Sequence, residues 1–272
     1  MSIITLLTDF GTQDYFVAAM KGMILSINPT ANIVDISHDI PPQDIQAAAF
    51  TLLCCYKSFP AGTIHVAVVD PGVGSDRKPI LIQCAQQFFV GPDNGIFNWI
   101  CAREKDWGAI HLTNDQFFRH PVSNSFHGRD IFAPVAAALS MGSAPAAFGE
   151  PLKDIVQLES LAPSAISENT IQGRIIHIDH FGNCVTTFTR ADLAPGKVAH
   201  SWKLLVNDRE INSFRDFFSE AGNNEIFCIF GSAGFLEISA RDASAAEILN
   251  LKRGQSLLFV SAALTEINAR CN

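Results

Sequence analysis

Apolar residues in the first half of the chain occur in short runs that alternate with stretches of helical spacing. The apolar runs predict strands at Ile3–Leu7, Asn32–Ile36, Thr63–Val69, Pro79–Cys84, Phe88–Val90 and Ile110–Leu112. The intervening stretches predict helices at about Tyr15–Ser26, Gln43–Tyr56, Ile96–Glu104 and Ile131–Met141. The run Val66-Ala67-Val68-Val69 has no polar residue, which is typical of a central parallel strand buried on both faces. The alternation predicts an α/β domain with a Rossmann-like, mainly parallel sheet and flanking helices.

The pattern changes at about residues 151–168, where proline and serine occur without clear periodicity. Short apolar runs then predict strands at Ile171–Ile178, Cys184–Phe188, Trp202–Val206, Ile226–Phe230, Phe235–Ser239 and Ser256–Val260. Turn residues separate them at intervals that suit a small antiparallel barrel or sandwich. We therefore predict two domains, an α/β domain over residues 1–158 and a β domain over residues 159–272.

The composition excludes some classes of partner. A net charge of -8 argues against nucleic acid or an anionic membrane as the main partner. No apolar run reaches the roughly 18 residues that a membrane span needs, and the amino terminus lacks the features of a signal peptide. The 7 cysteines are odd in number and scattered. Together these features predict a reduced, cytoplasmic compartment.

Polar residues follow the third predicted strand directly. Asp70 is succeeded by Pro71, Gly72 and Gly74, and Arg77 completes the segment. Ligand sites of α/β sheets lie at the carboxyl ends of parallel strands, so Asp70 is a candidate for chemistry, and the glycines let the turn approach a ligand. The alternative is a structural ion pair between Asp70 and Arg77 that locks the turn.

Two further polar groups occur in the predicted α/β domain. Asp9 and Asp14 follow the first strand, and a carboxylate there can accept hydrogen bonds from a ribose diol. The alternative for Asp14 is to cap the helix that begins near Tyr15. His127 lies in a loop before a predicted helix and is the better functional candidate there, whereas Asp130 is suited to the positive end of that helix dipole.

The β domain contains a fourth polar group, His177-Ile178-Asp179-His180-Phe181-Gly182-Asn183. Its histidine spacing matches no zinc arrangement, so we predict no metal site. A loop that offers Asp179, Phe181 and Asn183 to a ligand is the favoured interpretation. The phosphate-binding and nucleophile motifs of other enzyme classes are absent from the sequence.

These groups occur together in one order along the chain. The motifs are Thr8-Asp9-Phe10-Gly11, Asp70-Pro71-Gly72-Val73-Gly74 with Arg77, Gly91-Pro92-Asp93-Asn94-Gly95, Phe126-His127-Gly128-Arg129-Asp130 and Asp179-His180-Phe181-Gly182-Asn183. In this the chain resembles the S-adenosyl-L-methionine (SAM) hydroxide adenosyltransferases, hydrolases related to the fluorinase and chlorinase enzymes. The resemblance implies that SAM and water give adenosine and methionine without a cofactor. It also implies a β-barrel second domain and a homotrimer with sites at subunit interfaces.

The resemblance also implies roles for individual residues. Asp70, Arg77 and His127 would form the water-activating set. The residues that would contact substrate are Asp9 at the ribose diol, Asp14 and Asp179 at the methionine ammonium, Ser232 at its carboxylate, Asn183 and Phe181 at the adenine, and Arg241 and Ala243 in the segment along the adenine edge. The chain differs from the halogenating relatives at Asp70, where they have tyrosine, and at Ala233, where they have arginine.

The residue types suit attack by water at the ribose C5′. The leaving group is a neutral thioether that needs no acid, so the site has only to activate and orient water. An ionised Asp70 would repel a halide by about 4 kcal/mol at 4 Å and an effective dielectric constant near 20. The alternatives are a halide (chloride) adenosyltransferase, a non-catalytic adenosine- or SAM-binding module, and a structural protein in which Asp70 and Arg77 only brace a turn.

Overall fold

A computed structural model describes residues 2–193 and 202–261, and the chain divides into two compact units, residues 1–160 and 161–272. We call these unit 1 and unit 2. None of the helices within the described residues is long and apolar enough to cross a bilayer.

Unit 1 contains one seven-stranded sheet with the strand order β2-β1-β3-β5-β4-β6-β7. Its strands are β1 (Ile3–Thr8), β2 (Asn32–Ser37), β3 (Ile64–Val68), β4 (Pro79–Cys84), β5 (Gln87–Pro92), β6 (Trp107–Leu112) and β7 (Gly149–Leu152). Its α-helices are α1 (Phe16–Ile27), α2 (Ile45–Cys55), α3 (Asn98–Glu104) and α4 (Ala133–Ser140). The short strand β7 was not predicted.

The sheet of unit 1 is mixed, which corrects the prediction of a mainly parallel sheet. The pairings among β2, β1, β3 and β5 are parallel, whereas β5–β4, β4–β6 and β6–β7 are antiparallel. The reversal comes from a two-residue turn in which Ala85 and Gln86 have φ values of 53° and 61°. Two successive positive φ values match the twist of a tight hairpin, so β4 folds back on β5.

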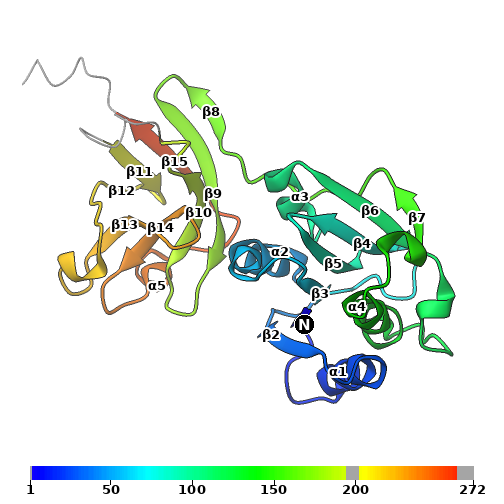
Figure 1. Cartoon of the computed structure of the whole chain (residues 1–272). Coiled ribbons are helices and arrows are strands. Elements are labelled where there is room, and N and C mark those ends of the chain that lie inside the picture. Colours follow the sequence, from blue (N-terminus) through cyan, green and yellow to red (C-terminus); the bar gives the residue numbers. More distant parts are fainter. Residues whose placement is uncertain (1, 194–201, 262–272) are drawn as a thin grey trace, which may run out of the picture. The chain divides into compact units, whose positions relative to one another are not determined.

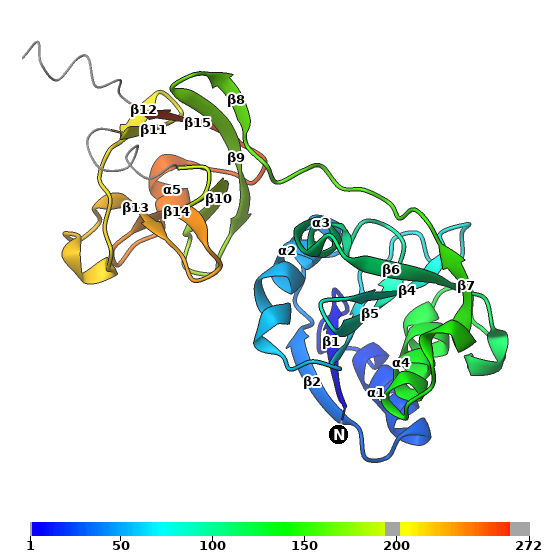
Figure 2. The same ribbon diagram turned by 45° about the horizontal axis from the view of Figure 1, so that its top comes forward.

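Helices cover both faces of this sheet. Met20 and Ile24 of α1 and Val135 of α4 share a buried cluster with Ile4 and Leu6 of β1. Because side chains alternate along a strand, the other face carries Leu7, and α2 contacts β1 there. Figures 1 and 2 show α1 beside α4 on one side of the sheet and α2 beside α3 on the other.

Unit 2 contains an eight-stranded antiparallel sheet that is nearly closed into a barrel. The strand order is β12-β11-β15-β9-β10-β14-β13, with β8 paired to β9. The strands are β8 (Ser164–Ser167), β9 (Thr170–Ile178), β10 (Cys184–Thr189), β11 (Trp202–Val206), β12 (Arg209–Ile211), β13 (Ile226–Phe230), β14 (Phe235–Ala240) and β15 (Ser256–Ser261), and the one described α-helix is α5 (Ala245–Leu249).

The near-closure of unit 2 depends on the segment that follows β12. The amide of Cys228 in β13 donates to the carbonyl of Ser213 at 2.8 Å, and Arg215 donates back to Cys228 at 3.0 Å. These bonds join the two ends of the strand order. The core of unit 2 includes Ile175, Phe188 and Leu236, and Figure 1 shows the curvature of these strands.

Candidate active site

The carboxyl ends of β1 and β3 bring two candidate carboxylates to one edge of the sheet. The two strands are parallel neighbours, with Thr8 opposite Val68. Asp9 follows the first strand, and Asp70 follows the second after one intervening residue. The side-chain amide of Asn94 donates to the Val69 carbonyl at 2.8 Å, which fixes the point where the chain leaves β3.

Asp70 and Arg77 form a buried, two-point ion pair. Arg77 Nε donates to Asp70 Oδ1 at 3.0 Å, and Arg77 Nη2 donates to Asp70 Oδ2. Their side chains are only 5% and 7% exposed, respectively, and the guanidinium lies 5.5 Å from the centre of the Phe132 ring. A fork-to-fork contact of this kind fixes the carboxylate in one orientation.

His127 joins this pair through the same guanidinium. Arg77 Nη2 lies 3.0 Å from His127 Nδ1. The structure therefore brings together the three residues predicted to activate water, although the assigned roles stay predictions. His127 is separated from Arg77 by fifty positions in the chain, and it immediately precedes a π-helical turn over Gly128–Phe132 that leads into α4.

The loop before His127 is held by Asp130, which is fully buried. Its carboxylate accepts from the Ser123 amide at 2.9 Å, from Arg119 at 3.1 Å and from Arg129 at 2.7 Å. Asp130 lies in the first turn of the π-helical segment, as expected for a dipole partner. Its contacts show that it is also the anchor of the loop that carries His127.

The turn after Asp70 packs against that same loop. Gly74 has a φ of +79°, and a methyl group on it would overlap the carbonyl oxygen of Asn124. Only glycine fits this position, because both the left-handed backbone and the close approach exclude a side chain. This contact sets the spacing between the Asp70 turn and the His127 loop.

Burial changes the protonation of both titratable residues in this cluster. Desolvation raises the pKa of Asp70, and the Arg77 charge opposes that effect only in part. Desolvation and the nearby Arg77 charge lower the pKa of His127. The site therefore combines a carboxylate of increased basicity with a histidine that favours its neutral form.

The two acidic residues of the β1–α1 loop differ in their contacts. Asp9 Oδ2 accepts from the backbone amide of Gln43 at 2.8 Å. Asp14 is exposed, and the residue that caps α1 is Tyr15, with no side-chain cap bond. The alternative in which Asp14 caps this helix is therefore wrong.

In unit 2, Asp179 organises the turn between β9 and β10. Asp179 Oδ1 accepts from the amides of Phe181 and Asn183 at 2.9 and 2.8 Å, and Oδ2 accepts from Asn183 Nδ2 at 2.9 Å. This leaves Phe181 74% exposed and Asn183 only 6% exposed. Local hydrogen bonding thus presents one aromatic ring and one amide oxygen beside each other.

A pocket of about 380 Å³ opens at this turn. It is lined by Phe181, Asn183, Phe218, Ala240, Asp242 and Ala243. The structure thus gathers Phe181, Asn183 and Ala243, three of the predicted substrate contacts. Phe218 was not among the predicted contacts, and the sequence offers no signal for it, because its place in the pocket depends on the folded chain.

Three other residues of unit 2 do not line the pocket. Arg241 donates through Nη1 to the Ala221 carbonyl at 2.7 Å and so braces the segment that carries Phe218. Ser232 is exposed in the turn between β13 and β14. Glu237, which was not predicted, is a half-buried carboxyl on β14, and burial together with the Asp179 charge raises its pKa to about 7.

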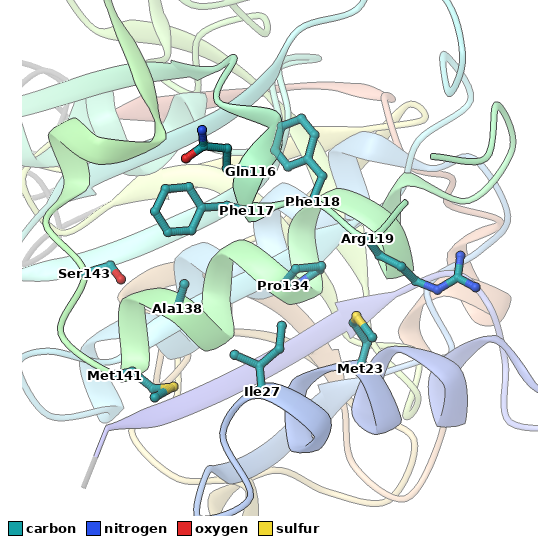
Figure 3. Close-up of a pocket in the computed structure, with 10 residues that line it drawn as sticks. All are labelled: Met23, Ile27, Gln116, Phe117, Phe118, Arg119, Pro134, Ala138, Met141 and Ser143. Atoms are coloured by element: carbon teal, nitrogen blue, oxygen red, sulfur yellow. The ribbon is translucent and has the colours of Figure 1, made fainter. Parts of the chain in front are cut away.

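A second pocket, of about 620 Å³, lies in unit 1 between α1, α4 and the 3-10 turn at Asp115–Phe117. Figure 3 shows Met23 and Ile27 facing Pro134 and Ala138 across it. None of the predicted site residues lines it. Over residues 2–193 and 202–261, no three His, Cys, Asp or Glu side chains are grouped in a way that could hold a metal ion.

The fold and the order of the two units are shared with a known structure. A crystal structure of an uncharacterized conserved protein from Thermotoga maritima superposes with a TM-score of 0.87 at 31% identity, covering 94% of this chain and 99% of that one. The chain is thus a two-domain protein that joins a mixed α/β unit to a β-barrel-like unit.

The comparison with protein families gives a specific assignment. Residues 4–149 match the SAM hydroxide adenosyltransferase N-terminal domain, and residues 173–258 match the C-terminal domain. An (R)-S-adenosyl-L-methionine hydrolase from Methanocaldococcus jannaschii is 36% identical, with 92% of this chain and 93% of that protein covered. A fluorinase from Nocardia brasiliensis is 26% identical, with 94% and 95% covered. This chain belongs to the SAM hydroxide adenosyltransferase family, which confirms the predicted family.

Proposed function

We propose that this protein hydrolyses SAM to adenosine and L-methionine by in-line attack of water at the ribose C5′. The observation that carries the proposal is the buried cluster in which one guanidinium holds Asp70 at two points and contacts His127. The relationship to the M. jannaschii hydrolase, at 36% identity over most of both chains, supports the choice of substrate.

The hydrogen bonds within the cluster assign different tasks to its members. A guanidinium only donates hydrogen bonds, so His127 Nδ1 is an acceptor and the neutral ring carries its proton on Nε2. His127 Nε2 is then suited to donate to the attacking water and hold it. Asp70, whose basicity is increased by burial, is suited to accept the proton that the water loses.

Arg77 offers a further donor for the developing hydroxide. Its Nη1 is buried and has no hydrogen-bond partner among the described residues. A buried donor without a partner costs about 1–3 kcal/mol, and an oxygen ligand at this position would remove that cost. A hydroxide-like oxygen would also gain charge stabilisation from the guanidinium.

The reaction balances without a general acid. The water oxygen forms a bond to C5′ while the C5′–sulfur bond breaks, and the electron pair of that bond neutralises the sulfonium. Methionine leaves as a neutral thioether, adenosine forms, and one proton passes from water to Asp70. Because the sulfonium charge disappears, a site sheltered from water favours this transition state over the separated charges.

The substrate contacts are proposals of the same kind. We assign the adenine to the pocket of unit 2, with its ring against Phe181. Asn183 Nδ2 is already engaged by Asp179, so Asn183 Oδ1 is the atom available to accept from the adenine amino group. The remaining assignments are Asp9 to the ribose diol, Asp14 and Asp179 to the methionine ammonium, and Ser232 to its carboxylate, with Ala243 lining the adenine pocket and Arg241 bracing it.

We also propose a homotrimer whose sites lie at subunit interfaces. The support is the division of the proposed contacts, since Asp9, Asp70 and His127 belong to unit 1 whereas Asn183 belongs to unit 2. A mixture of Asp70→Asn and Asn183→Asp subunits, unfolded and refolded together, tests sharing between subunits. Activity that returns on mixing supports shared sites. A mixture no more active than its two components indicates that each subunit builds its own site.

The experiment that tests the reaction uses product analysis in heavy-oxygen water. Each sulfur epimer of SAM is incubated with the protein in H₂¹⁸O, with and without excess chloride. We expect adenosine that carries the label at its 5′ oxygen. Release of 5′-chloro-5′-deoxyadenosine instead would establish the halide transferase, and intact SAM of both epimers after long incubation would establish a binding module.

The Asp70→Asn variant tests the assigned base in the same assay. We expect turnover to fall by about 10²–10⁴-fold, the usual contribution of a general base, while the adenosine Kd changes little. Its melting temperature is measured as well, because the variant leaves the buried Arg77 charge without its counterion. Wild-type turnover by a folded variant would remove Asp70 from the mechanism.

A further inference from the structure

His38 is a buried histidine at the end of β2 that the proposed chemistry does not use. It is 6% exposed. Its Nδ1 lies 2.8 Å from Thr8 Oγ1, and its Nε2 lies 3.1 Å from Asp35 Oδ1. Asp35 in turn receives the Lys21 ammonium at 2.6 Å. The ring is therefore hydrogen-bonded to β1 through Nδ1, whereas Nε2 lies at ion-pair distance from Asp35 and has no hydrogen-bond partner among the described residues.

His38 holds the β1–α1 loop at two points. Its backbone carbonyl accepts from the Gly11 amide at 2.8 Å. Its ring binds the Thr8 hydroxyl, whose oxygen also accepts from the Phe10 amide at 3.2 Å. These contacts lie on both sides of Asp9, so the backbone on either side of that carboxylate is tied to one residue of the neighbouring strand.

The Asp9 carboxylate is also held by a hydrogen bond of its own. Asp9 Oδ2 accepts from the Gln43 amide, and Gln43 has a φ of 66°. The side chain is thus held from one oxygen while its backbone is held by His38. A carboxylate fixed in this way keeps its second oxygen in one place, which a directional contact to a sugar hydroxyl requires.

We infer that His38 is a positioning residue that sets the Asp9 carboxylate for recognition of the ribose hydroxyl groups. The inference rests on the proposed function, because it concerns the ribose of that substrate. It predicts that removal of the His38 ring reduces the preference of the protein for a ligand with ribose hydroxyl groups over one without them. A loss of stability alone would leave this preference unchanged.

The chain provides a matched control in β3, on the other side of β1. His65 Nδ1 lies 2.8 Å from Thr5 Oγ1, the same contact that His38 makes with Thr8. His65 is fully buried near the amino-terminal end of β3, opposite the carboxyl end that leads to Asp70. Removal of its ring should disturb folding in a similar way without touching the loop that carries Asp9.

The test compares the Kd values of adenosine and 2′,3′-dideoxyadenosine, measured by calorimetry on the full chain. We expect the wild-type protein to prefer adenosine by about tenfold or more, as for a hydrogen bond to a charged group. His38→Ala should reduce this preference by about threefold or more. His65→Ala should keep the preference while its melting temperature falls.

A second variant keeps the test decisive if His38→Ala folds poorly. Asp35→Asn retains the ring and weakens its far contact together with the exposed Lys21 ion pair, so we expect a smaller loss of preference in the same direction. A wild-type preference that survives in both variants would overturn the inference and leave the proposed function intact. Equal Kd values for the two nucleosides in the wild-type protein, or no adenosine binding, would overturn the inference, whereas only the absence of labelled adenosine in the H₂¹⁸O assay would overturn the proposed function.

Discussion

Arg77 Nη2 lies 3.0 Å from His127 Nδ1 and belongs to the guanidinium that also holds Asp70. One cation thus borders both titratable groups of the proposed site. Its charge lowers the pKa of His127 in the same direction as burial does. For Asp70 the same charge opposes burial, and the net pKa is still raised.

The pH dependence of turnover follows from the raised pKa of Asp70 and the lowered pKa of His127. The proposed mechanism needs an ionised Asp70 and a neutral His127, and both forms are lost as pH falls. The pKa of His127 lies below its ordinary value of 6.5, so we expect kcat/KM to be level above about pH 6.5 and to decline in more acidic solution. Rates that rise toward acid would contradict this assignment.

Two substitutions of His127 separate holding the water from removing its proton. If Nε2–H only donates to the water, His127→Gln can replace that donor with its side-chain amide. We expect His127→Gln to retain at least about tenfold more turnover than His127→Ala, the usual energy of one hydrogen bond to a charged group. Equal losses in steady-state assays would instead favour a proton-accepting histidine.

Gly74→Ala should move the Asp70 turn away from the His127 loop. The added methyl meets the Asn124 carbonyl, and the φ of +79° is strained for alanine. Gly62→Ala is the control, since Gly62 has a similar φ of +80° but nothing within 4 Å of an added methyl group. We expect both variants to lose stability in thermal unfolding, by about 1 kcal/mol for the control, and only Gly74→Ala to lose most of its turnover.

His65 should make the protein less stable in acid. Burial lowers its pKa from 6.5 to about 4, so between these values the unfolded chain binds a proton that the folded chain does not. The free energy of unfolding should therefore fall as pH decreases from 6.5 to 4, by up to about 3 kcal/mol from this residue. Denaturant titrations of His65→Gln should show a shallower decline, and parallel curves would contradict the prediction.

Glu237 should have the opposite effect on stability. Its pKa is raised from 4.5 to about 7, so the folded state binds the proton more tightly, and stability is lost as pH rises through 7. Glu237→Gln removes this loss, and we expect its melting temperature to exceed that of wild type by more at pH 8 than at pH 5. A difference independent of pH would show that the Glu237 carboxyl is not shifted.

Glu225→Gln is the matched control for this experiment in unit 2. The Gly222 amide and the Ser213 hydroxyl lower the pKa of Glu225, so its stabilising effect is present at neutral pH and lost in acid. The Glu225 variant should accordingly be less stable than wild type at pH 8. The two glutamates should therefore respond with opposite signs in the same thermal assay.

Features that depend on residues close together in sequence were predictable. The apolar run before Asp70 predicts a buried strand, and β3 ends two residues before Asp70. The turn at Asp179 is likewise built from bonds to residues two and four positions away. A strand pattern or a turn is encoded in local spacing, and here the local preferences agree with the final fold.

Features that depend on strand order were not predictable. The mixed sheet follows from which strands pair beyond the β4–β5 hairpin. His38 can contact Thr8 only because β2 lies beside β1, and Phe218 lies in a segment that Arg241 holds through the Ala221 carbonyl. In each case the packing of the whole core determines which segments become neighbours. The periodicity of apolar residues within one segment does not contain this information.

The difference between the predictable and the unpredictable features has a physical cause. Short-range hydrogen bonds and alternating burial are settled within a few residues, so the amino-acid order alone specified the elements, the candidate carboxylates and the family they indicate. The meeting of Arg77 with His127, and the shift that burial imposes on each neighbouring pKa, arise only when distant segments exclude water together. That desolvation is a property of the assembled core and not of any single segment.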